Sequence, residues 1–157
     1  MTWKIATVSL LFLGLLGLAT AEHPTSESAL RKNLGRKLAS LRRDYPRLAY
    51  AWNDDQLGNY WVCNANFGIY TRKGTVTLVT IRASNVQIQG VSVGDSVRQM
   101  ESRFGEAETM RIQVCSLSMG QQRTQPVVME YPERHLLVLC KKGKVMGILL
   151  TGRQPVL

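Results

Sequence analysis

Hydrophobic positions recur at helical spacing in the N-terminal part of the chain. Four leucines lie three or four residues apart, at Leu30, Leu34, Leu38 and Leu41. This spacing places their side chains on one face of a helix, which we expect over residues 28–43. Pro46 cannot continue a helix and marks its end. Six of the sixteen residues in this segment are basic, so the predicted helix is amphipathic.

A second, shorter helical pattern has clear start and stop signals. Its apolar face consists of Val97, Met100 and Phe104. Ser96 precedes this face and Gln99 follows three residues later, which is the spacing of a capping box. Gly105 follows at once, and glycine readily takes the left-handed turn that ends a helix. The sequence therefore predicts a capped helix over residues 96–104.

Elsewhere the pattern changes to short apolar or alternating runs between turn residues, which is typical of antiparallel strands. We expect strands at residues 61–63, 67–71, 75–83, 110–117, 127–131, 135–140 and 144–151. Glycines at 74 and 143 supply tight turns for two hairpins. Residues 48–60 mix aromatic and turn-forming residues and are expected to connect helix and sheet. The predicted fold is α+β, an antiparallel β-meander packed against one or two short helices.

Two hairpins in the chain resemble each other. Residues 71–76 and 140–145 share Lys, Gly and Val at matching positions, and a predicted helix precedes each. This echo is consistent with a duplicated helix-plus-sheet unit, although short basic hairpins of this kind also arise by chance.

The first 21 residues have the pattern of a secretory signal peptide. Lys4 is followed by an apolar run over residues 5–18, and Ala19-Thr20-Ala21 supplies small residues for cleavage. A transmembrane helix is the competing interpretation, but the run is shorter than the roughly 20 residues of a membrane span. We expect cleavage near Ala21 and a secreted or periplasmic protein. In the remaining chain, residues 22–58 form the basic helix and its connection, residues 59–157 form the α+β sheet domain, and both belong to one globular unit.

Positive charge is concentrated in the predicted N-terminal helix. The chain after Ala21 holds 19 basic and 11 acidic side chains, a net charge of +8. Six of the basic residues form a candidate binding surface: Arg31, Lys32, Arg36, Lys37, Arg42 and Arg43. The helix either packs its leucines on the sheet with a solvated basic face, or it also docks an anionic lipid, polysaccharide or acidic protein.

Four aromatic residues follow within twelve positions, and three of them form a candidate aromatic surface, Trp52, Tyr60 and Trp61. Such rings could stack on sugars or bases. They could equally pin the helix to the sheet, because aromatic side chains bury large areas.

The chain has three cysteines, so one internal disulfide at most can form. Export favours oxidation, and Cys115 and Cys140 are the expected pair because both lie in predicted strands. The alternative is that Cys63, Cys115 and Cys140 are all small buried core residues. No spacing typical of a metal site occurs, and no metal or cofactor is expected.

No nucleophile–base motif, phosphate-binding loop or dinucleotide fingerprint is present. The acid–base residues that a small hydrolase could use are Asp54, Asp55, Glu101 and His135. An enzyme of this kind requires the fold to bring at least two of them into one cleft.

The capped helix and the last hairpin together resemble a known α+β repeat. The matching positions are Val91, Val93, Gly94, Ser96, Met100, Phe104 and Gly105, then Leu136, Val138, Gly143, Val145, Gly147 and Ile148. Over residues 88–152 this pattern is similar to the repeat of the β-lactamase inhibitory protein and of the small lipoprotein of the outer-membrane β-barrel assembly machinery. The chain departs from that pattern at Ala107, where members often have proline, and it lacks the cysteine near the start that the lipoprotein members need for lipidation. The resemblance implies a protein-binding or scaffolding role.

We therefore expect a secreted or periplasmic, non-catalytic binding or scaffold module for an anionic protein, lipid or cell-envelope partner, with peripheral membrane contact as one form of it. The alternatives are the small hydrolase described above and, third, a nucleic-acid-binding protein, which charge and aromatic content suggest but export disfavours.

Overall fold

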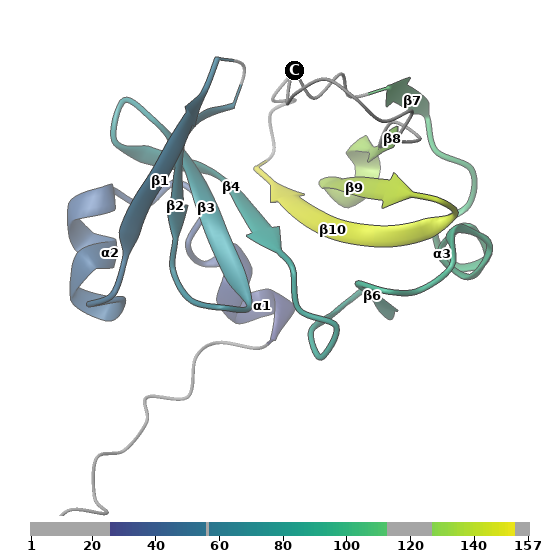
Figure 1. The fold of residues 1–157 in the computed structure, drawn as a ribbon, viewed down its shortest axis with the longest axis horizontal. Helices are drawn as coiled ribbons and strands as arrows, with labels where there is room; N and C mark the ends of the chain where they lie inside the picture. The colour runs from purple at the N-terminus through teal and green to yellow at the C-terminus, as the bar shows by residue number, and fades with distance from the viewer. Residues whose placement is uncertain (1–25, 56, 113–126, 153–157) are drawn as a thin grey trace, which may run out of the picture.

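The computed structural model describes residues 26–55, 57–112 and 127–152. Eight of its strands form one antiparallel sheet in the order β1-β2-β3-β4-β10-β9-β8-β7 (Figure 1). These strands are β1 (Ala49–Asp54), β2 (Gly58–Val62), β3 (Phe67–Arg72), β4 (Thr75–Ile81), β7 (Thr109–Ile112), β8 (Val127–Tyr131), β9 (Leu136–Lys141) and β10 (Lys144–Thr151). The remaining elements are α1 (Glu27–Arg31), α2 (Leu38–Asp44), β5 (Gln87–Ile88), β6 (Val91–Ser92), α3 (Val97–Phe104) and the 3₁₀ turn η1 (Pro132–Arg134). The predicted α+β class is confirmed.

The sheet consists of two four-stranded meanders that meet at its centre. The first half runs from α1 to β4 and the second from β5 to β10, so the last strand of each half lies beside the other (Figure 1). Thr80 and Leu149 are opposite each other at this junction. On either side of them, Ile81 pairs with Ile148 and Val79 pairs with Leu150.

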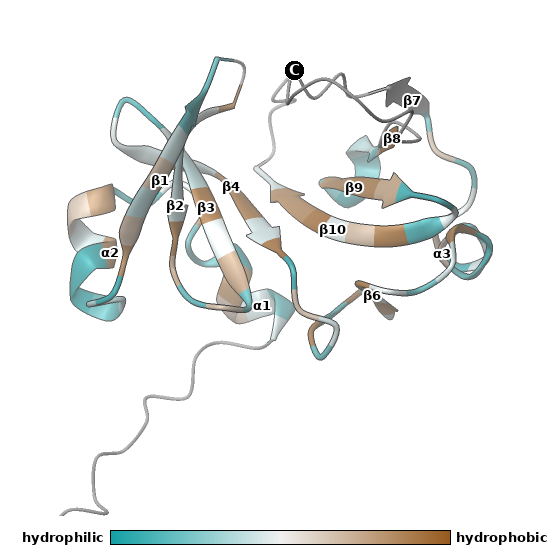
Figure 2. Ribbon diagram, in the orientation of Figure 1, coloured by the Kyte–Doolittle hydropathy of each residue, from teal (hydrophilic) through white to brown (hydrophobic). Residues whose placement is uncertain are grey.

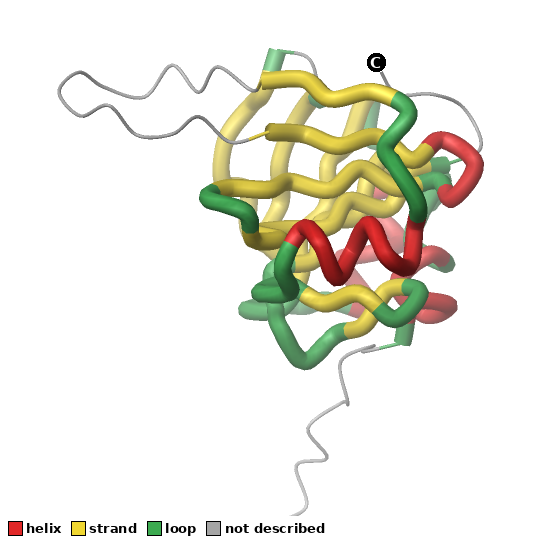
Figure 3. The backbone as a smooth tube through the Cα atoms, turned by 90° about the vertical axis from the view of Figure 1, so that its right-hand side faces the viewer, coloured by secondary structure: helices red, strands yellow, loops and turns green. Residues whose placement is uncertain are grey.

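The main hydrophobic core lies between one face of the sheet and the helices. It contains Leu30 of α1, Leu41 of α2 and Met100 of α3, all nearly inaccessible to solvent, together with Ile81 and Ile148 from the central strands. Figure 2 shows hydrophobic residues along β9 and β10 and hydrophilic ones at the turns. α3 lies beside the sheet near the small β5–β6 hairpin (Figure 3). We call the opposite face of the sheet, which carries no described helix, the open face.

The predicted helix at residues 96–104 is confirmed with its capping box. Ser96 Oγ accepts from Gln99 N at 3.2 Å, and Gln99 Oε1 accepts from Ser96 N at 2.9 Å. Gly105 ends the helix with φ +84°. Met100 and Phe104 are buried against the sheet, as their spacing predicts.

The prediction of one helix over residues 28–43 is wrong, because the segment forms two short helices. Gly35 adopts φ +77° between them, and its N–H donates to Val76 O at 2.9 Å. Val76 N in turn donates to Arg36 O at 2.9 Å. Backbone pairing with β4 therefore replaces the helical hydrogen bonds at this point, although the leucine spacing alone fits one continuous helix.

The second half contains the same backbone arrangement. Gly94 N donates to Val145 O and Val145 N donates to Asp95 O, both at 2.8 Å. One residue further on, Ser96 bridges to Lys144, as Lys37 bridges to Thr75 in the first half. The residue before α2 in the first half, and the residue before α3 in the second, thus pairs with the first residue after a Lys-Gly turn.

β1 was not expected, since residues 48–60 are predicted to be a connection. The strand is at one edge of the sheet and pairs with β2, with a bulge between Tyr50 and Trp52. The predicted strands at residues 127–131 and 144–151 have the observed bounds. β7 ends at Ile112, and the rest of the strand expected at residues 110–117 is outside the described residues.

Candidate functional site

Three of the six candidate basic residues form an ion pair or a hydrogen bond with another described side chain, and three do not. Two of them form ion pairs within the first half: Arg31 Nε is 2.8 Å from Glu27 Oε1, and Arg36 Nη1 is 2.7 Å from Asp44 Oδ2. Arg31 also donates to the carbonyl of Arg134 at 3.1 Å, which ties α1 to the second half. These two guanidinium groups are therefore partly neutralised and held in place.

A third basic residue, Lys37, donates through Nζ to Thr75 Oγ1 at 2.8 Å. Lys32, Arg42 and Arg43 are exposed, and none forms an ion pair with another described residue. Arg47, in the turn after α2, is exposed in the same way. We call Arg42, Arg43 and Arg47 the α2 basic patch.

The α2 basic patch adjoins two of the aromatic residues. The Arg42 guanidinium carbon is 5.6 Å from the centroid of the Trp61 ring, a cation–π geometry. Tyr50 contacts the same indole edge-to-face at 5.3 Å, and Trp61 Nε1 donates to Thr71 Oγ1 at 3.0 Å. Trp61 is thus fixed between α2 and the sheet, and it links the predicted basic and aromatic residues in one place.

The other two members of the predicted aromatic set lie on the open face. Trp52 stacks on Tyr60 at 4.3 Å, and Tyr60 contacts Tyr70 at 4.8 Å. Trp52 is 49% exposed, whereas Tyr60 and Tyr70 are buried. The expected surface of Trp52, Tyr60 and Trp61 is therefore split between the two faces of the sheet. Tyr70 was missed by the sequence analysis, although it faces Tyr60 directly in the β2–β3 register.

The tyrosine cluster is closely packed. A side chain at Gly68 would overlap the Tyr60 hydroxyl, so this position requires glycine. The Arg82 guanidinium carbon is 5.8 Å from the centroid of the Tyr60 ring. Burial, followed by the negative charge of Asp54, raises the pKa of Tyr70 to about 12. This phenol is therefore neutral at physiological pH.

Two of the three cysteines are free, buried thiols. Burial raises the pKa of Cys63 to about 12 and that of Cys140 to about 11, so both are protonated and poor nucleophiles at neutral pH. Cys140 Sγ is 3.7 Å from Met129 Sδ. The expected disulfide at Cys140 is not formed, because this thiol packs in the core; Cys115 lies outside the described residues.

The acid–base candidates are on separate elements. Asp54 and Asp55 are at the β1–β2 turn, where Asp54 Oδ1 accepts from Leu57 N at 2.8 Å. Glu101 is on α3, at the other end of the molecule (Figure 1). His135 follows η1 in the left-handed conformation, with φ +53°. The structure keeps the aspartates apart from both other residues.

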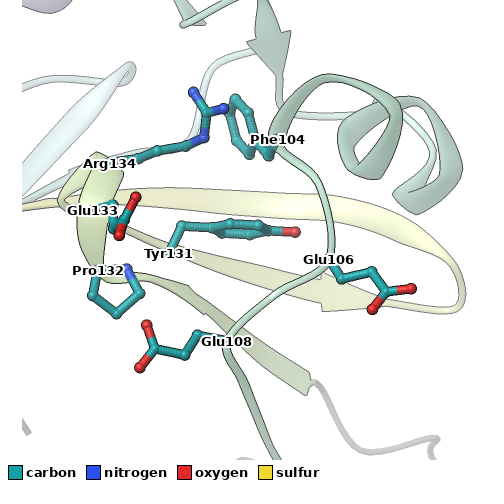
Figure 4. A pocket seen from close by; sticks show the side chains of 7 residues that line it. All are labelled: Phe104, Glu106, Glu108, Tyr131, Pro132, Glu133 and Arg134. Atoms are coloured by element: carbon teal, nitrogen blue, oxygen red, sulfur yellow. The ribbon is translucent and has the colours of Figure 1, made fainter.

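A cavity of about 440 Å³ lies between α3 and η1 (Figure 4). Its lining residues are Phe104, Glu106, Glu108, Tyr131, Pro132, Glu133 and Arg134. Phe104 and Tyr131 meet edge-to-face at 5.2 Å, and the Arg134 guanidinium carbon lies 5.0 Å from the Phe104 centroid. None of the acid–base candidates lines this cavity. Its three exposed carboxylates make it the acidic counterpart of the α2 basic patch.

Among the described residues, no three His, Cys, Asp or Glu side chains are grouped so that they could hold a metal ion. No helix in this part of the chain has the length and apolar character needed to span a membrane.

Comparison of the chain with protein-family models, with curated proteins and with solved structures gave no match in any of the three.

Proposed function

We propose that the protein is an exported, non-catalytic binding module that holds an acidic partner protein at the α2 basic patch. The observation that carries this proposal is the contact of Arg42 with Trp61, which joins an exposed guanidinium group to an anchored aromatic ring. Arginine and tryptophan are the residue types most often found at the energetic centre of protein interfaces.

Charge favours an anionic partner. Arg42, Arg43 and Arg47 lie within six positions of the chain, and none of them is neutralised by a described carboxylate. By contrast, Arg31 and Arg36 are already paired and would contribute less to binding. An anionic protein offers carboxylates that can accept two hydrogen bonds from one guanidinium group, so arginine suits it better than lysine would.

The experiment measures binding of the exported chain to a poly-glutamate peptide, to vesicles of anionic lipid and to an anionic polysaccharide, each at rising salt. In a Trp52→Phe variant, Trp61 is the one tryptophan left in the exported chain, and its fluorescence reports contact at the patch. We expect binding to poly-glutamate that weakens steeply with salt, because exposed charges are screened over about 8 Å at physiological ionic strength. Preference for vesicles or polysaccharide would instead identify an envelope component as the partner.

A matched pair of double variants separates the patch from overall charge. Arg42→Glu/Arg43→Glu should reduce affinity about tenfold or more, because it places like charges against the partner. Arg98→Glu/Lys144→Glu changes the net charge equally at exposed positions of the second half and should have a much smaller effect. Equal effects of the two double variants, or binding insensitive to salt, would exclude the patch as the site.

We also infer that the two halves are copies of one helix-plus-meander unit. The equivalent backbone hydrogen bonds of Gly35 and Gly94 support this, as does the symmetric pairing of β4 with β10 about Thr80 and Leu149. The resemblance to the β-lactamase inhibitory protein repeat remains a prediction. It agrees with a binding role because the same unit would supply one extended sheet for a partner.

A further inference from the structure

One edge of the sheet is a strand that is exposed along almost its whole length. β1 has β2 as its neighbour in the sheet, and residues 49–53 are all exposed. Tyr50 and Trp52 are 54% and 49% exposed, which is unusual for side chains of this size. The outward backbone groups of an edge strand are free to pair with another strand.

Edge strands are commonly protected by a charged residue or a proline. Neither occurs at residues 49–53, and the one charged residue of β1, Asp54, is at its last position. The bulge at the middle of β1 places the two aromatic rings on opposite faces, Tyr50 against Trp61 and Trp52 against Tyr60. A strand added to this edge would therefore contact an aromatic side chain on each face.

The charges at the two ends of β1 indicate which strand would fit. Arg47 lies two residues before the strand and Asp55 immediately after it. Both are exposed, and neither forms an ion pair with a described residue. When two copies of β1 pair antiparallel about a two-fold axis, the Arg47 end of each lies beside the Asp55 end of the other. The edge is thus electrostatically complementary to itself.

We propose that β1 pairs with β1 of a second copy, giving a symmetric dimer in which the sheet continues through both chains. The backbone supplies the hydrogen bonds, the exposed aromatic rings supply the apolar contact, and the charged ends select the antiparallel direction. This proposal does not depend on the acidic partner, because its evidence is the exposed edge and its two ends.

The test is the molar mass of the exported chain, measured by light scattering and sedimentation over a wide range of concentration. We expect a monomer–dimer equilibrium. Ala51→Lys adds a charge in the middle of the edge and should make the chain monomeric. Met146→Lys, at another exposed apolar residue on β10, should leave the equilibrium unchanged.

A charge-exchange series tests the direction of pairing. Arg47→Asp and Asp55→Arg each create like charges at both ends of the interface and should weaken the dimer about tenfold or more. The double variant Arg47→Asp/Asp55→Arg should restore the dimer, since it only exchanges the ends. Circular dichroism checks that every variant is folded.

A monomer at all concentrations would overturn the proposal, including the case in which the edge binds only an added extended peptide. A dimer that persists in Ala51→Lys, or one that the double variant does not restore, would overturn it as well. The mass measurement needs no acidic ligand, so its failure is distinct from failure of the α2 basic patch.

Discussion

α2 begins at Lys37 without a side-chain cap, whereas α3 begins at Ser96 with a complete capping box. Both helices nevertheless start at the same place relative to their own hairpin. Gly35 and Gly94 donate to equivalent valine carbonyls in the last strand of each half. The carbonyl of the residue after each glycine accepts from the N–H of the same valine. Backbone pairing with the sheet therefore positions these helices, and the cap adds stability to a start that is already fixed.

The halves differ more on the open face. In the first half, Tyr70 lies between Tyr60 and Leu78 in the register. At the corresponding place in the second half, Leu139 lies between Val128 and Gly147. Among the described residues, the aromatic contacts of the open face are therefore confined to the first half, which also carries the α2 basic patch and β1. The features proposed for binding gather on one of two similar frameworks.

The largest expected effect is from a charged residue placed in the core at equivalent positions of α2 and α3. Leu41 in α2 and Met100 in α3 are both fully buried, so Leu41→Asp and Met100→Asp should each cost about 5 kcal/mol or more and unfold the chain. Circular dichroism and urea denaturation measure this. Ala39→Asp and Arg98→Asp, at exposed positions of the same helices, should remain folded. A stable Met100→Asp protein would show that α3 faces water.

An effect of a few kcal/mol is expected at alkaline pH. An unfolded thiol ionises near pH 9, whereas burial raises the pKa of Cys63 to about 12 and of Cys140 to about 11 in the folded chain. The folded state therefore holds these protons more tightly, and stability that is complete below pH 9 falls as pH rises through this range. Urea denaturation from pH 8 to pH 11 measures the loss.

Substitution of the thiols tests which groups set this slope. Cys63→Ala and Cys140→Ala should each flatten the alkaline slope, because each removes one thiol whose pKa burial raises. The slope, not the stability at neutral pH, is compared, since both substitutions also remove buried volume. Equal slopes in the wild type and both variants would show that neither thiol governs alkaline unfolding.

The smallest effect tests the helix caps. Ser96→Ala removes the acceptor for Gln99 N and should cost about 1 kcal/mol. Lys37→Ala removes no cap and only an exposed contact to Thr75, so it should cost less than about 0.5 kcal/mol. Thermal denaturation of the two variants makes the comparison. A larger loss for Lys37→Ala would mean that its contact with Thr75, and not backbone pairing, positions α2.

Sequence reasoning predicted the elements whose signals are local. The capped helix at residues 96–104 and the hairpin turns at Gly74 and Gly143 follow from neighbouring residues, and all are observed. It failed where a distant partner decides the conformation. The leucine spacing continues across Gly35 and does not indicate that pairing with β4 divides the helix. The sequence of residues 49–54 does not predict a strand, because that strand depends on pairing with β2.

The candidate site shows the same division. The basic and aromatic residues could be listed from the sequence. The contact of Arg42 with Trp61 could not be predicted, because nineteen positions separate the two residues. Neither was the neutralisation of Arg36 by Asp44, nor the separation of Trp52 from Trp61 on opposite faces.

The α+β class, the capped helix, the tight turns and the excess of positive charge follow from the amino-acid sequence, because each depends on residues close in the chain or on composition. The order of the strands, the contact of β4 with β10, the faces on which the aromatic rings lie and the exposure of β1 are known only from the folded structure. These depend on which distant backbone groups pair, and a sheet fixes that pairing only when all its strands are in place.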